Sequence, residues 1–184
     1  MDQEDKRQVF HICIGLAAVA FLLFFGREIT IAAVFCTLIF GTVLMNARLL
    51  GIVLPFISWF EENFERKNAP INGWGSACYA TGALFALTFL TNVEQIAATV
   101  LILGLGDGLS TIVGRRGKMK LVHNKKKTLE GTVAFALASL TAYYFVGVAA
   151  VPISIIAALV ESSPYFDDNL LIPVACTVFF LVAI

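Results

Sequence analysis

Charged residues with glycine neighbours gather in one segment of the chain, residues 104–132. Seven of the thirteen Lys and Arg residues lie within residues 115–127. Two acids, Asp107 and Glu130, each adjoin a glycine and flank this basic run. Carboxylates can hold a divalent cation, and guanidinium and ammonium groups bind phosphate oxygens. The combination is therefore typical of a site that handles a metal-bound polyphosphate.

The rest of the chain is strongly apolar. Apolar residues make up 59% of the 184 positions, charged residues only 14%, and sixteen residues are Phe. This composition is too apolar for a soluble domain of such length and predicts an integral membrane protein. We expect the lipid bilayer, and no nucleic acid, as its partner. A charge in an apolar setting costs about 2.5 to 3.5 kcal/mol on insertion scales, so acids beside a membrane span indicate ion or substrate chemistry.

Apolar runs separated by charged, glycine or proline breaks predict an all-α fold. A span needs about 20 residues, with about 17 as the short limit. The sequence favours a single domain, residues 1–184, built as a polytopic bundle of about six or seven transmembrane helices. The expected helices are residues 9–25, 29–45, 75–90, 93–113, 131–145, 148–160 and 170–184. Residues 49–60 are too few to cross and include Pro55, which favours an interfacial helix.

The distribution of basic residues predicts the orientation in the membrane. Basic residues are enriched in cytoplasmic loops. Placing the basic loop, residues 114–130, in the cytoplasm also puts the N-terminus on that side, whereas residues 91–94 would lie outside without a basic residue. The other basic residues expected on the cytoplasmic side are Lys6, Arg7, Arg48, Arg66 and Lys67. The active site is then expected at the cytoplasmic face.

Residues 131–160 allow two arrangements, because thirty residues are few for two spans and many for one. Two short helices joined near Gly147 would return the chain to the cytoplasmic face and bring Glu161, Asp168 and Asn169 to the level of Asp107. One long kinked helix would put these acids on the opposite face.

The GLGDG run, residues 104–108, has three glycines in five positions. Each glycine destabilises a helix interior by about 1 kcal/mol relative to Ala, so the helix is expected to break here. A broken helix that lines a polar cavity can offer its amides to an anion, while Asp107 holds a cation such as Mg²⁺. The alternative to a phosphate-binding role is that the basic loop serves only as a topology signal or a contact to anionic lipids.

The segments GDGLSTIVGRRGK and KKTLEGT resemble the signature of the CTP-dependent polyprenol kinases, a family that includes dolichol kinase, phytol kinase and CTP-dependent diacylglycerol kinase. RQVFH, with Arg7 and His11, resembles their N-terminal RKxxH element, although Gln8 replaces the Lys. Glu161 with DDNLLIP resembles their C-terminal element. The resemblance implies transfer of the CTP γ-phosphate to the hydroxyl of a membrane isoprenoid alcohol, with Mg²⁺ or another divalent cation.

The resemblance also implies roles for single residues. Asp107, Glu130 and Asp168 are expected to be catalytic, and Asp107 and Asp168 to bind the metal. The expected nucleotide-binding residues are Gly106, Gly108, Ser110, Arg115, Lys118, Lys126, Lys127, Thr128, Gly131 and Asn169. His11 and His123 are further candidates for the site.

Two other functions compete with the kinase. One is a cytidylyltransferase that moves CMP from CTP to a phospholipid, and the other is a non-enzymatic transporter or lipid-binding protein. Polar groups gathered at one face favour an interfacial enzyme over a transporter, which would need polar residues at mid-membrane depth in several spans. The residues leave the isoprenoid alcohol and the oligomeric state open.

Overall fold

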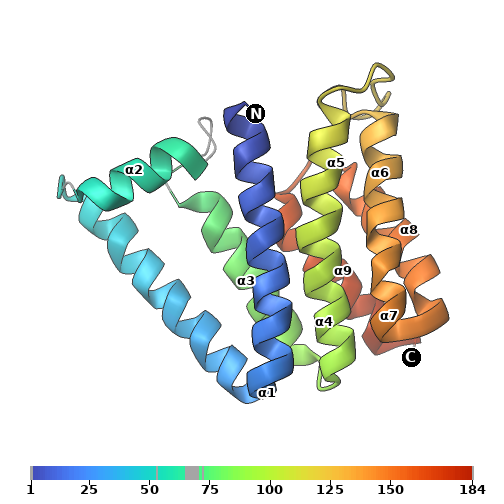
Figure 1. Cartoon of the computed structure of the whole chain (residues 1–184), viewed down its shortest axis with the longest axis horizontal. Helices are drawn as coiled ribbons and strands as arrows, with labels where there is room; N and C mark the ends of the chain where they lie inside the picture. The colour runs from blue at the N-terminus through green and yellow to red at the C-terminus, as the bar shows by residue number, and fades with distance from the viewer. Residues whose placement is uncertain (1, 53, 65–70, 72, 184) are drawn as a thin grey trace.

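A computed structural model describes residues 2–52, 54–64, 71 and 73–183 of the chain. In this part of the chain all the regular structure is helical, apart from one isolated antiparallel bridge between Lys120 and Thr128. The helices run mainly along one direction and pack side by side, with the N-terminus and the basic loop at the same end (Figure 1). This arrangement confirms the all-α prediction.

Helix α1, Gln3–Leu49, consists of two limbs that meet at Gly26 (φ 76°, ψ 175°) and form a V in Figure 1. Such a positive φ is available to glycine at little cost. The kink falls between the two apolar runs expected from the sequence. Beside it, the Arg27 guanidinium donates hydrogen bonds to the carbonyls of Leu87 (2.8 Å) and Leu90 (2.9 Å), which ties the kink to the end of helix α3, Trp74–Phe89.

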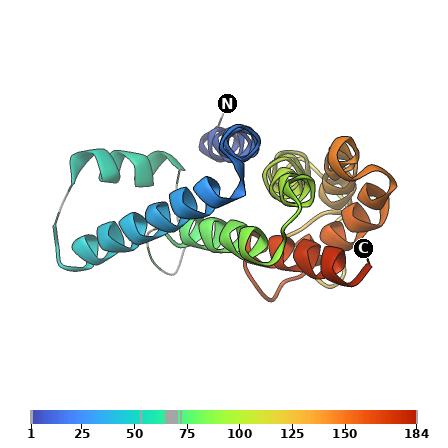
Figure 2. The ribbon, with the colours of Figure 1, turned by 90° about the horizontal axis from the view of Figure 1, so that it is seen from below.

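Helix α2, Pro55–Phe64, has ten residues and is too short to cross a bilayer, as expected for an interfacial helix. It leans back onto the first limb of α1, where the Phe10 ring lies 5.5 Å from Phe60 and 4.3 Å from Phe64, measured between ring centroids. Seen from below in Figure 2, α2 and the second limb of α1 stand apart from the main bundle. Arg66 and Lys67, used to predict the orientation, lie outside the described residues.

Helices α4, Val93–Leu101, and α5, Asp107–Gly114, form one rod through the centre of the bundle. The glycine-rich residues between them form a π-helical turn, η1, Ile102–Gly106, and Asp107 keeps helical angles. The expected break is therefore wrong. Because the turn is buried among neighbouring helices, widening the helix by one residue keeps its amides bonded, whereas an open break would leave them without partners.

After the basic loop the chain forms α6, Leu129–Ser139, three short elements and α8, Ala150–Glu161. The short elements are η2, Leu140–Ala142, α7, Tyr143–Val146, and η3, Gly147–Ala149. Gly147 has φ 55°, which lets the chain turn back. The structure thus adopts the two-helix arrangement of residues 131–160. Helix α9, Asp168–Ala183, follows and packs against α3 and α8.

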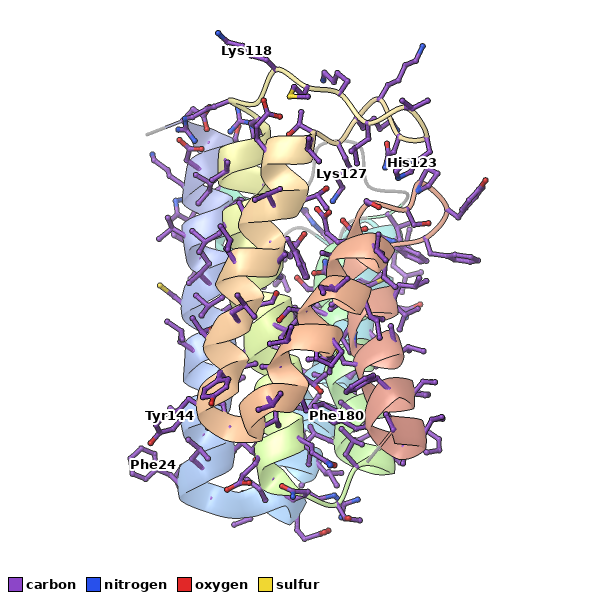
Figure 3. The ribbon with its side chains drawn as sticks, turned by 90° about the vertical axis from the view of Figure 1, so that its right-hand side faces the viewer. Phe24, Lys118, His123, Lys127, Tyr144 and Phe180 are labelled. Atoms are coloured by element: carbon purple, nitrogen blue, oxygen red, sulfur yellow. The ribbon has the colours of Figure 1, made fainter. Side chains whose placement is uncertain are left out.

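Among the described residues, three helical segments have the length and apolar composition to cross a membrane: Gln3–Leu49, Val93–Gly114 and Leu129–Glu161. The first is kinked at Gly26 and the last turns back at Gly147. Asp168–Ala183 is a shorter apolar helix. Exposed apolar side chains such as Phe24 and Tyr144 cover the outer surface of the bundle (Figure 3), as expected for contact with lipid. The number of six or seven crossings and the cytoplasmic orientation stay predictions.

Candidate active site

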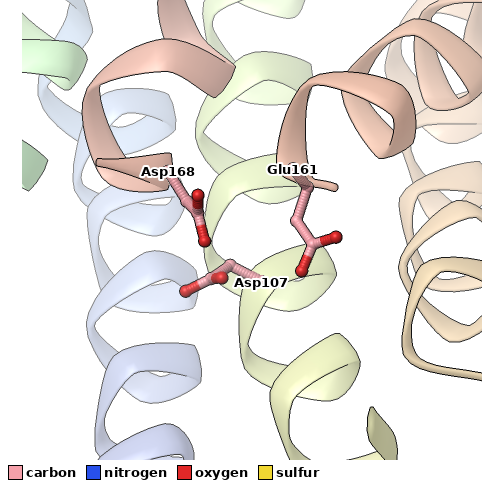
Figure 4. Close-up of side chains that lie close together, drawn as sticks. All are labelled: Asp107, Glu161 and Asp168. Atoms are coloured by element: carbon pink, nitrogen blue, oxygen red, sulfur yellow. The ribbon is translucent and has the colours of Figure 1, made fainter. Parts of the chain in front are cut away.

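Three buried carboxylates from distant parts of the sequence meet near one end of the bundle. Asp107 begins α5, Glu161 ends α8 and Asp168 begins α9. Their residues are only 2%, 1% and 8% exposed, and one oxygen of each lies within 4.8 Å of the others. Figure 4 shows the three side chains pointing toward one another. We call this group the carboxylate cluster.

Lys127 points from the basic loop into the bundle (Figure 3) and reaches the carboxylate cluster. Its ammonium group donates hydrogen bonds to Glu161 Oε1 and, at 2.7 Å, to Asp168 Oδ2. Burial alone would lower the pKa of Lys127, but the charges of Asp168, Glu161 and Asp107 raise it above its ordinary value. Lys127 therefore stays protonated at neutral pH. With the acids ionised, the cluster still carries two uncompensated negative charges.

The charge of the cluster and its free oxygens fit a divalent cation. Asp107 Oδ1 and Glu161 Oε2 are buried without a hydrogen-bond partner. Taking a carboxylate out of water costs several kcal/mol unless a countercharge and hydrogen bonds compensate it. A cation such as Mg²⁺, which binds one or two protein carboxylates together with phosphate oxygens, would supply that compensation. The Ser110 hydroxyl already donates to Glu161 Oε1 at 2.9 Å and thereby orients this side chain.

A second group of polar side chains faces Asp107 from the side of α1 and α3. His11 Nε2 lies 3.6 Å from Asp107 Oδ2, and the His11 ring packs edge-on against Tyr79 at 5.0 Å between centroids. Neither His11 Nε2 nor the Tyr79 hydroxyl has a hydrogen-bond partner, and the same holds for Asn169 Oδ1. All three residues line an apolar groove that also reaches Asp107. The cluster is thus approached from two sides.

The basic loop is held in place by hydrogen bonds from its own ends. The Glu130 carboxylate accepts hydrogen bonds from the backbone amides of Lys118 (2.7 Å) and Met119 (3.1 Å). Glu130 is therefore outside the carboxylate cluster, and it shapes the loop rather than facing the other acids. The Thr128 hydroxyl caps α6 through the Gly131 amide.

The far side of the loop docks on the turn before α9. Asn124 Nδ2 donates to the Ser162 carbonyl at 3.1 Å, and His123 Nε2 lies 3.2 Å from the Ser162 hydroxyl. Lys118 and Lys126, both predicted to bind nucleotide, are exposed. Lys118 points away from the bundle at the outer edge of the loop in Figure 3. Of the cations with predicted nucleotide roles, only Lys127 touches the carboxylate cluster.

Arg115, a predicted nucleotide ligand, is bound to the N-terminus. Its guanidinium donates to Asp2 Oδ2 at 2.7 Å and to Asp5 Oδ1 at 3.3 Å, while Arg116 bonds Asp5 Oδ2 at 2.6 Å. The hydrogen bond from Arg115 lowers the pKa of Asp2, and Asp2 in turn raises the pKa of Arg115. In this structure the acids, not a phosphate, satisfy these guanidinium groups.

The predicted glycine ligands lie at close helix contacts. A Cβ atom on Gly131 would lie 2.9 Å from Gly114 Cα and from the Ser110 carbonyl oxygen, and one on Gly106 would meet Ser139 Oγ at 2.8 Å. A Cβ on Gly108 would clash with Ile12 of α1. Each of these glycines thus has a packing role, and their contacts to nucleotide stay predictions.

The sequence indicated some of the site residues and missed others. Glu161 was noted in the C-terminal element but not among the predicted ligands, and its burial beside Asp107 is the signal that was lacking. His11 was a candidate through RQVFH. Tyr79 lies in no recognised motif, and only the packing of α3 against α1 places it at the groove.

Fold and site together define the class of protein: a helical bundle with membrane-length apolar helices and a buried, lysine-bound carboxylate cluster open to an apolar groove. No protein-family model matches the chain, and no solved structure matches it.

Curated proteins from an archaeon and from plants are similar to the chain over nearly its whole length. An uncharacterized protein of Methanocaldococcus jannaschii is 28% identical over 93% of this chain and 89% of its own length. Probable phytol kinase 2, chloroplastic, of Oryza sativa is 30% identical over 94% of the chain, and farnesol kinase, chloroplastic, of Arabidopsis thaliana is 31% identical over 93%. The chain spans 64% and 62% of the length of these two plant proteins. The similarity supports a relation to the polyprenol-type kinases.

Proposed function

We propose that the protein is a membrane kinase that transfers the γ-phosphate of CTP to the hydroxyl of an isoprenoid alcohol. The observation that carries the proposal is the carboxylate cluster, which has Lys127 on one side and an apolar groove on the other. The names of the plant relatives, phytol kinase and farnesol kinase, support an isoprenoid alcohol as acceptor. The choice of CTP as donor rests on the resemblance of residues 107–131 to the polyprenol kinase signature.

In this proposal Asp107, Glu161 and Asp168 hold a divalent cation, Mg²⁺ by preference. The bound cation would neutralise the charge of the triphosphate and polarise the γ-phosphate. Phosphoryl transfer asks a protein mainly for positioning and charge neutralisation, so no covalent nucleophile is needed. Lys127 adds a fixed positive charge next to two of the ligands. The exposed lysines Lys118 and Lys126 offer contacts to the outer phosphates from the same end of the bundle.

The acceptor side is assigned to the residues that face Asp107 from the groove. The alcohol oxygen forms a bond to the γ-phosphorus while the bond from that phosphorus to the β,γ-bridging oxygen breaks, which yields the lipid monophosphate and CDP. The hydroxyl proton must leave during this step. His11 Nε2, buried without a hydrogen-bond partner 3.6 Å from Asp107 Oδ2, is placed to accept it.

Position-specific labelling of the nucleotide tests the proposal. The purified protein in nanodiscs is given CTP labelled at the α- or the γ-phosphate, Mg²⁺, and farnesol, phytol or a longer polyprenol. We expect only the γ-label in lipid. The α-label in lipid would support the cytidylyltransferase instead. Label transfer from ATP but not from CTP would refute CTP as the donor and leave the kinase activity in place. Absence of transfer from either nucleotide to any alcohol would overturn the kinase.

A pair of carboxylate substitutions links the activity to the cluster. Asp107→Asn is expected to lower kcat by about 100-fold or more, because the ligand loses its charge while its shape is kept. Glu94→Gln removes an exposed carboxylate near the opposite end of the α4–α5 rod and serves as the matched control. Equal activity of the two variants at ordinary Mg²⁺ would contradict the assignment of Asp107.

A further inference from the structure

The groove beside Asp107 is a defined feature of the fold. It has a volume of about 560 Å³ and lies between both limbs of α1, α2 and α3. Its walls are mostly apolar and include Ile14, Leu38, Met45, Ile57, Phe60 and Ala80. The kink at Gly26 creates it, because the second limb of α1 diverges from the first and α2 bridges back to Phe10.

Some of the polar residues that line the groove have buried atoms without a hydrogen-bond partner. Four buried atoms with no hydrogen-bond partner belong to residues that line it: His11 Nε2, the Tyr79 hydroxyl, Asp107 Oδ1 and Asn169 Oδ1. Buried polar atoms normally have partners, and leaving one unpaired costs about 1 to 3 kcal/mol. Several unpaired atoms in one place therefore point to a missing ligand group.

The chemistry of these unpaired atoms selects a neutral hydroxyl. A hydroxyl can donate to His11 Nε2, the proton acceptor of the proposed transfer, and accept from the Tyr79 hydroxyl at the same time. In the proposed kinase the triphosphate takes up the cation held by the cluster, so a phosphate headgroup in the groove would bring negative charge without a countercharge. An alkane tail alone would leave the polar atoms unpaired. The occupant is therefore an uncharged lipid alcohol and not a phospholipid.

The size of the groove and its opening indicate how long a lipid tail it can hold and how the tail enters. A volume of about 560 Å³ falls within the range of about 300 to 1,000 Å³ for pockets that hold drug-sized ligands. Phe40 and Phe56 line the groove and yet are 63% and 71% exposed, so the groove opens at the outer surface of the protein. In a bilayer this surface faces lipid, and a substrate could enter sideways without leaving the membrane.

We propose that this groove binds the chain of a medium-length isoprenoid alcohol, of about the size of farnesol or phytol, and delivers its hydroxyl to Asp107. The inference rests on the proposed kinase function and adds the acceptor site to it. Tyr79 and Asn169 position the hydroxyl, and the walls formed by α1, α2 and α3 select the chain. The part of a longer polyprenol that exceeds the groove would extend through the opening into the bilayer.

Filling the groove tests the proposal. Gly41 lines the groove, and a Cβ added there meets nothing within 4 Å, so Gly41→Phe places a ring in open space. We expect its KM for phytol to rise about tenfold or more, with the KM for CTP unchanged. Ala32→Phe adds a ring to the exposed side of the same limb and should change neither KM. Ala80→Leu, on α3, repeats the test from the opposite wall should Gly41→Phe fail to fold.

A binding experiment without nucleotide separates this inference from the kinase proposal. The full chain in phosphatidylcholine nanodiscs is photolabelled with a diazirine analogue of farnesol. We expect labelled peptides from the second limb of α1 and from α2, competition by unlabelled farnesol, and loss of labelling in Gly41→Phe but not in Ala32→Phe. Such labelling without any phosphate transfer would support the groove as the binding site of the alcohol and refute the proposed kinase activity.

The reverse results would overturn the groove assignment. Phosphate transfer with labelling spread over the lipid-facing surface, or with equal KM values in Gly41→Phe and Ala32→Phe, would retain the kinase and refute the groove. Equally strong labelling by a phosphatidylcholine photoprobe that farnesol does not displace would show that a phospholipid occupies the groove.

Discussion

Two glutamates at helix ends, Glu161 and Glu130, have opposite surroundings although each follows an apolar residue in the sequence. Glu161 is 1% exposed, accepts hydrogen bonds from Lys127 and Ser110 on one oxygen, and keeps the other oxygen buried without a hydrogen-bond partner. The Glu130 carboxylate instead accepts hydrogen bonds from the backbone amides of Lys118 and Met119. The first can bind a cation without breaking its hydrogen bonds, whereas the second cannot.

We therefore expect Glu161→Gln to reduce catalysis far more than Glu130→Gln does. Removing the charge of a ligand should lower kcat by about 100-fold or more and raise the Mg²⁺ concentration needed for half-maximal rate. Glu130→Gln weakens loop hydrogen bonds and should mainly affect the KM for nucleotide. Steady-state rates as a function of Mg²⁺, with thermal denaturation as a folding control, measure both. A larger kcat loss in Glu130→Gln would restore the catalytic role expected for Glu130 and remove Glu161 from the site.

At the scale of elements, glycines set how closely the helices approach the site. Gly131 of α6 faces Gly114 of α5, and Gly15 of α1 faces Gly104 of the π turn, where an added Cβ would lie 2.8 Å from Gly104 Cα. The first contact brings α5 and α6 together, and the second brings α1 against the π turn. The π turn itself, Ile102–Gly106, adds a residue to the rod just before Asp107 and so helps to set the direction of its side chain.

Gly131→Ala tests whether this glycine packs or binds nucleotide. Its Cβ would be forced against backbone atoms of α5, so we expect a loss of about 1 to 3 kcal/mol of stability. Gly41→Ala, in a helix with open space at the added Cβ, is the matched control and should be neutral or gain about 0.5 to 1 kcal/mol. Thermal denaturation in detergent compares them. An unchanged midpoint for Gly131→Ala, together with weaker nucleotide binding, would favour the nucleotide role.

At the scale of the whole molecule, the return of the chain between α6 and α8 brings the site together. The turn through η2, α7 and η3 reverses the chain, so Glu161 and Asp168 arrive at the end where Asp107 and the basic loop lie (Figure 3). All the cluster residues, the N-terminus and the loop then share one end, while residues 90–92 lie at the other (Figure 1).

Cysteine labelling tests how this arrangement sits in the membrane. In a background in which Cys13, Cys36, Cys78 and Cys176 are replaced, single cysteines are introduced as Ser163→Cys and Thr91→Cys. Loops rich in Lys and Arg are enriched on the cytoplasmic side of membrane proteins. We therefore expect a membrane-impermeant thiol reagent to reach Ser163→Cys only from the cytoplasmic side and Thr91→Cys only from the other. Labelling of both from one side would contradict the proposed topology, and labelling in the reverse order would invert its orientation.

Local patterns in the sequence determined most of the helices. Apolar runs with glycine or proline breaks predicted all-α structure, the separation of the first two runs at Gly26, and the short helix after Pro55. Asp107 and the basic run that ends at Lys127 were candidates because charges in an apolar chain are costly and therefore informative. The role expected for Asp168 came from the resemblance to the polyprenol kinases. Such signals depend on neighbouring residues and on composition, so no tertiary contact was needed to read them.

The tertiary structure decided which charges meet and what the glycines do. Glu161 and Asp168 reach Asp107 only because residues 131–160 turn back, and the sequence was compatible with either path. Glu130, Arg115 and Lys118 have the same side-chain chemistry as the cluster residues, but hydrogen bonds to the backbone, contacts with the N-terminus and exposure to solvent set them apart. The groove likewise has no local signature. It arises where two limbs of one helix diverge, and its polar end comes from four separate parts of the chain that only packing brings together.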